Sequence, residues 1–487
     1  MGQLYLTGAD PGAKTEASMH LEQGVEDAVL PVDEENKDDP LNWPYWQKVY
    51  IVGLVAILSF TAQFSSALIN PGYVEMSEDL KVTVEQCSYC TTIFILFSGV
   101  APLLVVPFAN VYGRRILYVL FMVLATAGDV LSAAASTYGG VVTGRVLNGI
   151  GSSIPLGIGA ATICDLFRQH ERGLFMGIYT LSVTNGPHLA PIVGGYVTQR
   201  LGWRWCFWIP AICQGFLWIL LICTLPETLF SREQHSKLEN SSFARRLLYH
   251  GKVLDRPIRL RDFGTSFRMI KYAAVTLPSI YYCTCNTYGS ALFAVTGSRI
   301  GSATYRFKTQ QTGLFMGVPL TVGCAIGEAS AGWVSDAIIN VYARRHNGYR
   351  KAEARLFLVP LCTLLCIGTA TYGFCVENER PWIQAAICMA VSGLGSQVAT
   401  TMVYTYCTDS YKSQSGEIGV VINLFKSVFA FNVGFYALPF GAKVGFTEEF
   451  STLAAINAAT LIPLVFLMFK GEEIRMRQGV PDDHRDL

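Results

Sequence analysis

Charged residues are scarce in this chain. Asp, Glu, Lys and Arg make up 15% of its 487 residues, whereas roughly a quarter is usual in soluble domains. The 37 basic and 36 acidic residues almost cancel, so the clustered basic face that a nucleic-acid partner requires is not expected. Because 51% of the residues are hydrophobic, the composition suits lipid better than water.

Paired metal-ligand spacing is also missing. The 14 cysteines are scattered, many of them within apolar runs, without the spacing of a zinc site or the density of a disulfide framework. The seven histidines are dispersed and form no cluster with candidate nucleophiles. We therefore expect no metal, no cofactor and no enzymatic activity. Residues 1–45 carry the acidic run PVDEENKDDP and no apolar stretch, so we expect no cleavable signal peptide.

Long apolar runs, by contrast, are abundant. A bilayer core of about 30 Å requires about 20 apolar residues in a helix. Because backbone groups in lipid need internal hydrogen-bond partners, each such run is expected to be a helix. The fold class is therefore an all-α integral membrane protein with twelve transmembrane helices, near residues 48–70, 88–108, 116–135, 139–165, 172–199, 204–225, 271–296, 311–335, 355–375, 381–405, 417–441 and 449–469.

Basic residues concentrate in alternate loops, as they do on the cytoplasmic side of membrane proteins. Residues 231–271 contain ten Lys and Arg, and the loops after the second and eighth runs add Arg114, Arg115, Arg344 and Arg345. Residues 72–87 instead carry four acids and one lysine. We therefore expect both termini to be cytoplasmic, in a plasma membrane, although a vacuolar membrane would give the same pattern.

The basic middle segment divides the chain into two groups of six helices. NVYGRR at residues 110–115 recurs as NVYARR at residues 340–345, in the equivalent loop of each group. Such repeats are typical of transporters built from related halves. We predict two pseudo-symmetric six-helix bundles, 48–226 and 271–470, a basic linker, 227–270, and cytosolic tails, 1–47 and 471–487.

This organisation resembles the major facilitator superfamily. The phrases DPLNWP (39–44), GWRWCFWI (202–209) and LPETLF (225–230) are similar to those of fungal twelve-span drug:proton antiporters. The resemblance implies the major facilitator fold and a monomeric secondary transporter that exchanges protons for a small organic solute, most simply an exporter of drugs, toxins or secondary metabolites. A proton-coupled importer of a cation such as a polyamine is an alternative, and a transporter-like sensor is a remote one.

Three motifs carry this resemblance, and the first follows the second run. The family reads G-x-L-a-D-r-x-G-r-k there, and this chain reads VPFANVYGRR at residues 106–115. Asn110 replaces the family's Asp and cannot form a charge-assisted pair, so the gate is expected to be held less firmly. In the second half Gly332 and Asp336 repeat the G-x-x-x-D spacing. The resemblance assigns a cytoplasmic gate to Asn110, Gly113, Arg114, Arg115, Asp336, Arg344 and Arg345, although the arginines could be positive-inside anchors only.

The second motif lies in the fourth run, where the family's R-x-x-q-G-x-G corresponds to Arg145, Asn148, Gly149 and Gly151. Arg145 lies about 10 Å into the membrane, where a charge is costly and usually paired or functional. Asp129 is expected at the same depth on the third helix. It either pairs with Arg145 or faces the outer loops. The resemblance implies a role in proton coupling for Arg145.

The third motif, in the fifth run, loosely matches the family's antiporter motif g-x-x-x-G-P-x-x-G-G with Gly186, Pro187, Pro191, Gly194 and Gly195. Glycines allow close helix contact and prolines bend the helix, and the resemblance therefore favours antiport. His188, within this motif, either relays a proton or packs against a hydroxyl or carbonyl group.

Two charges in the second half are also expected within the membrane. Glu328 lies about 12 Å, and Lys426 about 14 Å, from the cytoplasmic ends of their runs. Neither belongs in hydrocarbon without a partner. They either pair with each other or face a wet central cavity as proton or substrate sites.

Overall fold

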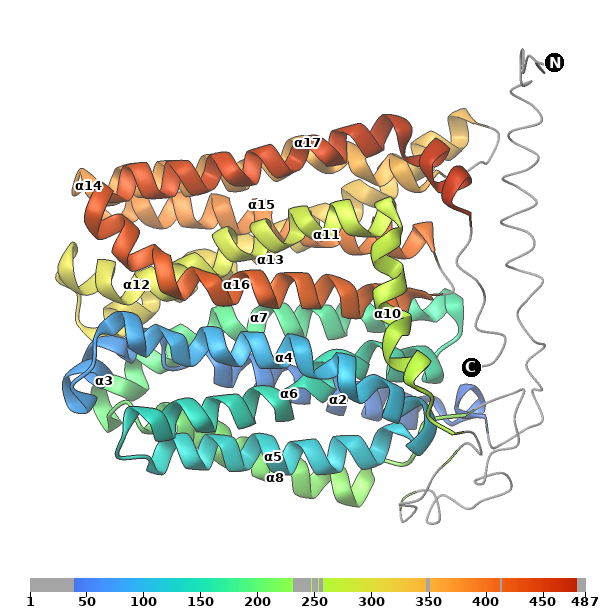
Figure 1. Ribbon diagram of the computed structural model, residues 1–487, viewed down its shortest axis with the longest axis horizontal. Helices are drawn as coiled ribbons and strands as arrows, with labels where there is room; N and C mark the ends of the chain where they lie inside the picture. The colour runs from blue at the N-terminus through green and yellow to red at the C-terminus, as the bar shows by residue number, and fades with distance from the viewer. Residues whose placement is uncertain are drawn as a thin grey trace.

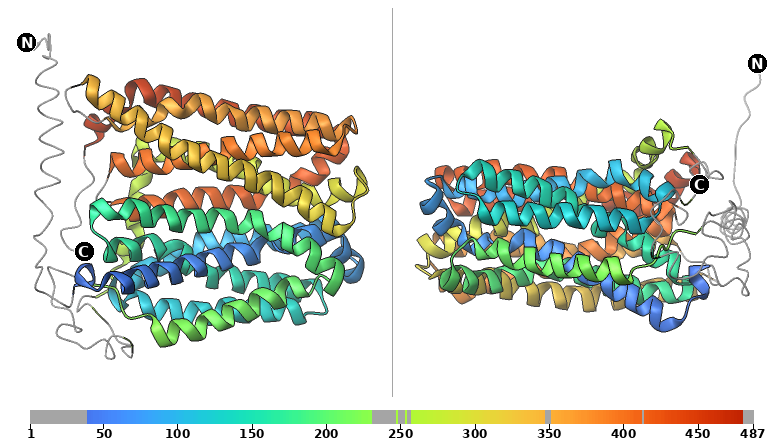
Figure 2. Two further views of the ribbon diagram at one scale, coloured as in Figure 1. Left: turned by 180° about the vertical axis from the view of Figure 1, so that it is seen from behind. Right: turned by 90° about the horizontal axis from the view of Figure 1, so that it is seen from below.

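The computed structural model describes residues 39–230, 247, 253, 257–346, 351–411 and 414–479. These residues form helices and no strands. Long helices lie side by side, and the helices of the first half occupy one side of the molecule in Figure 1 and in the left view of Figure 2. The predicted N-terminal tail, except its last residues, and much of the predicted linker lie outside the described part.

Among the described residues, ten helical segments are long and apolar enough to cross a membrane. Their main helices are α2 (Tyr45–Ala67), α4 (Val84–Tyr112), α5 (Arg114–Ala134), α6 (Tyr138–Leu166), α8 (Trp205–Thr224), α13 (Thr309–Arg345), α14 (Val359–Glu377), α15 (Trp382–Ser410), α16 (Ser415–Val444) and α17 (Phe446–Gln478). Two further segments complete the twelve that we expected. They are α7 (Gln169–Leu201) and a composite of α11 (Ala273–Asn286), the π-helical turn η5 (Thr287–Ala291) and α12 (Leu292–Ala303).

Helix α7 is not among those ten apolar segments, and its middle is rich in hydroxyl and amide side chains. Thr180, Ser182, Thr184 and Asn185 each donate a hydrogen bond to the carbonyl four residues earlier. These bonds satisfy the polar side chains within the helix. A segment of modest hydropathy can therefore cross a bilayer, because its polar groups do not depend on water.

Short elements lie at the two ends of the long helices. Near the beginning of the described chain is η1 (Pro40–Asn42), and η2 (Asn70–Gly72) and α3 (Tyr73–Leu80) follow α2 at one end. The opposite end carries η3 (Leu260–Gly264), α10 (Thr265–Arg268), η4 (Met269–Lys271) and η6 (Ala352–Leu358). We call these two ends the α3 end and the linker end (Figure 1).

Two predicted loops are wrong, because the helices that flank them are longer than the apolar runs. Helix α13 continues ten residues beyond 335, so Arg344 and Arg345 lie in its last turn. Between α4 and α5 only Gly113 is non-helical, with φ of 101°. A glycine adopts this backbone conformation readily and ends α4. The second copy of the repeat has Ala343 at that position, and its helix continues.

The hydrophobic core follows the two halves. One large cluster consists of buried residues between Trp43 and Leu225, and another of buried residues between Met269 and Leu467. Each half therefore buries apolar side chains against its own helices, with a separate interface between the halves. The predicted pair of six-helix bundles is confirmed, whereas the predicted boundaries of the halves remain a prediction.

Candidate functional site

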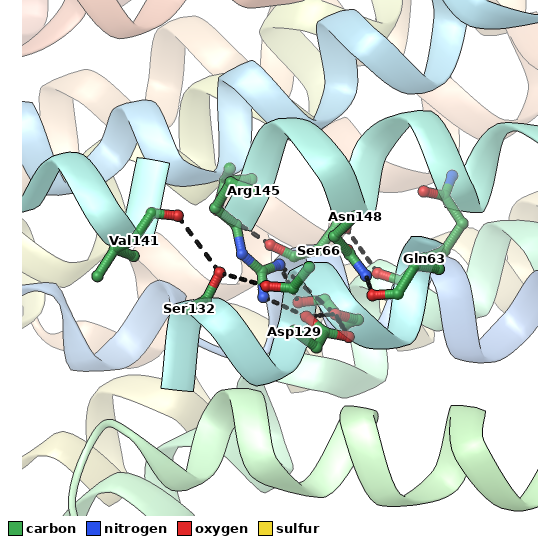
Figure 3. A network of polar contacts seen from close by, with 11 residues as sticks. Gln63, Ser66, Asp129, Ser132, Val141, Arg145 and Asn148 are labelled. Carbon is green, nitrogen blue, oxygen red and sulfur yellow. Dashed lines mark hydrogen bonds and ion pairs between the residues drawn. The ribbon is translucent and has the colours of Figure 1, made fainter. Parts of the chain in front are cut away.

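A buried ion pair lies within the first half. Arg145 of α6 donates from Nη2 to Asp129 Oδ1 of α5, and both side chains are fully buried. The Ser65 hydroxyl of α2 bonds to both oxygens of Asp129, at 3.0 Å each, and the Ser65 carbonyl accepts from Arg145 at 3.3 Å. Figure 3 shows this network. Of the two arrangements that the sequence left open for Asp129, the structure has the direct pair.

The pair forms because α5 and α6 approach each other closely. A Cβ atom on Gly128 would lie 2.6 Å from the carbonyl oxygen of Gly144, so only glycines fit at this contact. Asn148 strengthens the same contact by donating to the Ala125 carbonyl at 2.9 Å. It therefore connects the two helices. Phe207 of α8, which sequence reasoning missed, lies 4.3 Å from the Arg145 guanidinium carbon and stabilises the cation.

The environment of the pair determines what it can do. Both charges are buried away from water. A buried charge is stable only while it is paired and hydrogen-bonded. Among the described residues, Arg145 Nε and Asn148 Oδ1 are buried without a hydrogen-bond partner, so the network is not fully satisfied there. Protonation of Asp129 would remove the charge that compensates Arg145, and the site would have to rearrange.

Arg114 and Arg115 occupy the start of α5 at the linker end. Arg114 Nε donates to Asp165 of α6 at 2.5 Å, and Arg115 donates to the last carbonyls of α8, Leu225 at 2.8 Å and Ile222 at 3.0 Å. A cation at a helix C-terminus is favoured by the helix dipole. These partners all belong to the first half, so here the arginines fasten α5 to its own bundle.

Glu227, also missed by sequence reasoning although it lies in the LPETLF phrase, holds the same turn. Its carboxylate accepts from the backbone N–H of Arg114 at 2.8 Å, of Arg115 at 3.0 Å and of Leu229 at 2.8 Å. Burial raises the pKa of this carboxyl, and the three hydrogen bonds oppose that rise. The motif is therefore a closed polar cluster around the N-terminus of α5.

In the second half the equivalent cation is Arg355, which the sequence comparison did not identify. Arg355 Nε donates to Asp409 of α15 at 2.6 Å, Nη1 donates to Ser335 at 2.7 Å, and Asp336 lies 3.7 Å away. The expected residues Arg344 and Arg345 form no ion pair with any residue that the structure describes. The NVYARR copy is similar to NVYGRR in sequence but not in structure. Because it lacks the glycine, its two arginines remain part of α13.

The antiporter motif places α7 between the two halves. A Cβ on Gly186 or Gly194 would meet the backbone of α2, at Phe60 and Leu68. A Cβ on Gly195 would lie 2.7 Å from the Thr309 carbonyl oxygen of α13, in the other half. Helix α7 is continuous through Pro187 and Pro191. Its glycines therefore permit backbone contact with α2 on one face and α13 on the other.

His188 lies at this interface between the halves. It is buried, and its Nε2 lies 3.4 Å from the Cys324 thiol of α13. Cys324 also donates to the Gly393 carbonyl at 3.5 Å. The partner is thus a thiol, and neither the hydroxyl nor the carbonyl that we expected from the packing interpretation.

Glu328 and Lys426 do not form the pair that the sequence left open. Glu328 accepts from Gln397 Nε2 at 2.5 Å and from the Thr401 hydroxyl at 3.1 Å, both on α15. Lys426 forms no hydrogen bond or ion pair within the described residues. Both side chains are half-buried. Asn110 likewise lies half-buried at the end of α4.

The halves are joined by polar contacts at the α3 end. Ser298 of α12 donates to the Pro71 carbonyl at 3.4 Å, and Thr309 donates to Glu75 at 2.7 Å. The backbone N–H of Gln310 donates to the Gln199 side chain at 3.0 Å. The molecule is therefore closed between its halves at this end.

Comparison with known proteins agrees with this arrangement. The family model of the Major Facilitator Superfamily matches residues 55–469. The MFS-type transporter hepF of Aspergillus oryzae is 28% identical over 94% of this chain and 96% of its own length, and the efflux pump radE of Floropilus chiversii is 25% identical over 97% and 92%.

Solved structures show the same fold. A D-xylose-proton symporter superposes with a TM-score of 0.66 at 14% identity, over 88% of this chain and 98% of that one. An inward-facing bacterial homologue of the lysosomal transporter Spinster gives 0.59 at 13%, over 91% and 100%. Because the family match covers most of the helices and the fold agrees, this chain belongs to the Major Facilitator Superfamily of transporters.

Proposed function

We propose that this protein exports a small organic compound in exchange for protons, by alternating access between its two halves. The observation that carries the proposal is the buried Asp129–Arg145 pair, a carboxylate whose charge state controls an otherwise uncompensated arginine. The name of the relative radE, an efflux pump, supports the direction of transport. We further propose that the protein is a monomer in the plasma membrane, with the linker end and both termini in the cytoplasm.

In the proposed cycle, a proton that reaches Asp129 neutralises the carboxylate and breaks its bond to Arg145. The arginine then needs other partners, which a different arrangement of α2, α5 and α6 would supply. Each charge that moves down a membrane potential releases about 2.3 kcal/mol per 100 mV, which is enough to drive export against a concentration gradient. The contacts at the α3 end would break in the state open to the outside.

The gate motif and the antiporter motif fit this cycle. Arg114 and Arg355 each fasten a helix start to an acid on the following helix of the same half. Each half can therefore move as a unit, as alternating access requires. Gly195 of α7 lies on one surface where the halves contact each other, and His188 lies on the same surface.

Transport in sealed proteoliposomes with an imposed pH gradient tests the proposal. A panel of drugs, polyamines and fungal metabolites is offered to the wild type, to Arg145→Ala and to Asp129→Asn. We expect solute movement opposite to the proton flow, lost in both variants. Arg204→Ala is the matched control, because it removes an arginine from an exposed ion pair with Asp79 in the same half, and it should transport normally.

Movement of solute in the same direction as the protons would contradict the proposed export and would support proton-coupled import. Movement that ignores the gradient, with Arg145→Ala as active as the wild type, would reduce the buried pair to a structural element. Correct folding of each variant is checked by its elution as a single species in detergent.

A further inference from the structure

Lys426 has an unusual position for a charged residue. It lies eleven residues after the start of α16 at Ser415, which corresponds to about 16 Å along the helix, near the middle of a core about 30 Å thick. It has no hydrogen-bond or ion-pair partner in the part of the chain that the structure describes. A lysine at this depth is costly unless it faces water or a ligand.

The helix geometry shows which way Lys426 faces. Val428 and Phe435 lie on the exposed side of α16, and a separation of two residues rotates Lys426 about 160° away from Val428. Gly419, seven residues earlier, lies on nearly the same face as Lys426, and the space beside it is open, with no atom within 4 Å of a Cβ position. Lys426 therefore points toward open space inside the bundle.

This space borders the other half of the molecule. Ser427, the next residue, packs against Gly99 of α4. One turn before Lys426, Asn423 accepts a hydrogen bond from the Tyr404 hydroxyl at 3.3 Å, and the Tyr404 ring lies 5.5 Å from that of Tyr282. The groups near Lys426 on these helices are thus neutral, hydrogen-bonding and aromatic.

No acid in the described part of the chain pairs with Lys426. Asp129 is bound to Arg145 in the first half. Glu328, the acid that we expected as its partner, accepts from Gln397 and Thr401. The acid Glu449 on α17 is buried against Gly441 of α16, which lies about 22 Å along the helix from Lys426. The positive charge is therefore left for a molecule that enters the space.

We propose that Lys426 binds the anionic group of the transported compound, and that the substrate is an organic carboxylate with an aromatic or apolar body. This inference rests on the proposed transport function and specifies its substrate class. The carboxylate replaces the missing counter-charge, and the apolar body fits beside the tyrosines. An inside-negative membrane potential favours the exit of such an anion, by about 2.3 kcal/mol per charge per 100 mV.

Equilibrium binding to the purified full-length protein, without any proton gradient, tests the inference. The probes are 1-naphthoate, 1-naphthamide and 1-naphthylmethylammonium, which share one ring system and differ in charge. We expect the wild type to prefer the carboxylate. Lys426→Met should weaken naphthoate binding about ten-fold or more, the loss expected for a hydrogen bond to a charged group, and leave naphthamide binding unchanged. Lys426→Arg should retain the preference.

Lys443→Met is the matched control, because Lys443 lies on the same helix but is exposed near its end, and it should bind naphthoate as the wild type does. Binding of none of the probes, equal binding of all three, or undiminished naphthoate binding by a folded Lys426→Met would each overturn the inference. Since no gradient is used, a protein that binds naphthoate through Lys426 but fails to exchange it for protons would contradict the proposed antiport alone.

Discussion

At the scale of single residues, the two halves differ in whether a charge within the membrane has a counter-charge. Arg145 is enclosed by Asp129, Ser65 and Phe207, and its counter-charge is part of the protein. Lys426 lies beside open space without a counter-charge in the described residues. A paired charge away from water can sense a proton through its partner. An unpaired charge beside open space can instead bind an ion of opposite sign.

The enclosed pair leads to a stability prediction. Asp129→Ala leaves Arg145 charged and unpaired, and we expect a loss of about 3–5 kcal/mol, the usual consequence of removing one partner of a buried pair. The double variant Asp129→Ala and Arg145→Met should lose less, because it buries no unpaired charge. The midpoint of thermal unfolding in detergent measures both.

An exposed ion pair in the same half provides the control for this comparison. Asp79→Ala breaks the pair with Arg204, and such a surface pair contributes about 1 kcal/mol or less. If the double variant proved less stable than Asp129→Ala alone, the argument from an unpaired buried charge would be wrong.

At the scale of helices, one residue separates the two copies of the repeat. Gly113 has a φ of 101° and ends α4, and a Cβ atom there would collide with the Glu227 carboxylate. Ala343 has helical backbone, and α13 continues past it. The positions of four arginines follow from this difference: Arg114 and Arg115 begin a new helix, whereas Arg344 and Arg345 end an old one.

The turn at Gly113 can be tested by making the first copy like the second. We expect Gly113→Ala to lower stability by about 1–3 kcal/mol from its positive-φ backbone alone, and further through the contact with Glu227. Gly332→Ala adds the same methyl group within α13, where nothing lies within 4 Å, and should be neutral or stabilising by up to about 1 kcal/mol. Equal thermal unfolding midpoints for the two variants would show that the turn does not need glycine.

At the scale of the whole molecule, contacts between the halves determine whether the α3 end is closed or open. Glycines of α7 and α13, together with hydrogen bonds from Ser298 and Thr309, close the α3 end. The largest apolar cluster of each half is built from its own helices, and Val84 and Ile95 of α4 also pack against a cluster of the second half. A change confined to the closed end should therefore shift the relation of the halves and leave each half folded.

Gly195→Leu makes such a change. Its side chain would meet the Thr309 carbonyl and Gly313 of the other half, so we expect the α3 end to open and transport to fall. Lys81 and Arg380 are exposed residues, one in each half. The distance between spin labels attached at these two positions should be longer in Gly195→Leu than in the wild type. Gly177→Leu places the same side chain on the same helix in open space and should report the wild-type distances. A wild-type distance distribution in Gly195→Leu would contradict the role of this contact.

Much of this architecture could be predicted from the order of residues. Each apolar run of about 20 residues has to become a helix in lipid, which predicts the helices and their order. Depth along a helix is also local, because each residue adds about 1.5 Å, and so Asp129 and Arg145 could be expected at one level. The ends of α4 and α13 were misjudged because helices continue into polar sequence beyond the membrane.

What the sequence by itself determined is therefore the fold class, the helices and the approximate depth of each charge. The tertiary structure decided the partners: Asp129 for Arg145, Cys324 for His188, Gln397 and Thr401 for Glu328, and Arg355 as the counterpart of Arg114. The physical reason is that a partner depends on the rotation of each helix and on how closely its neighbour approaches. Both are set by packing between segments far apart in the chain, as at Gly128 and Gly144.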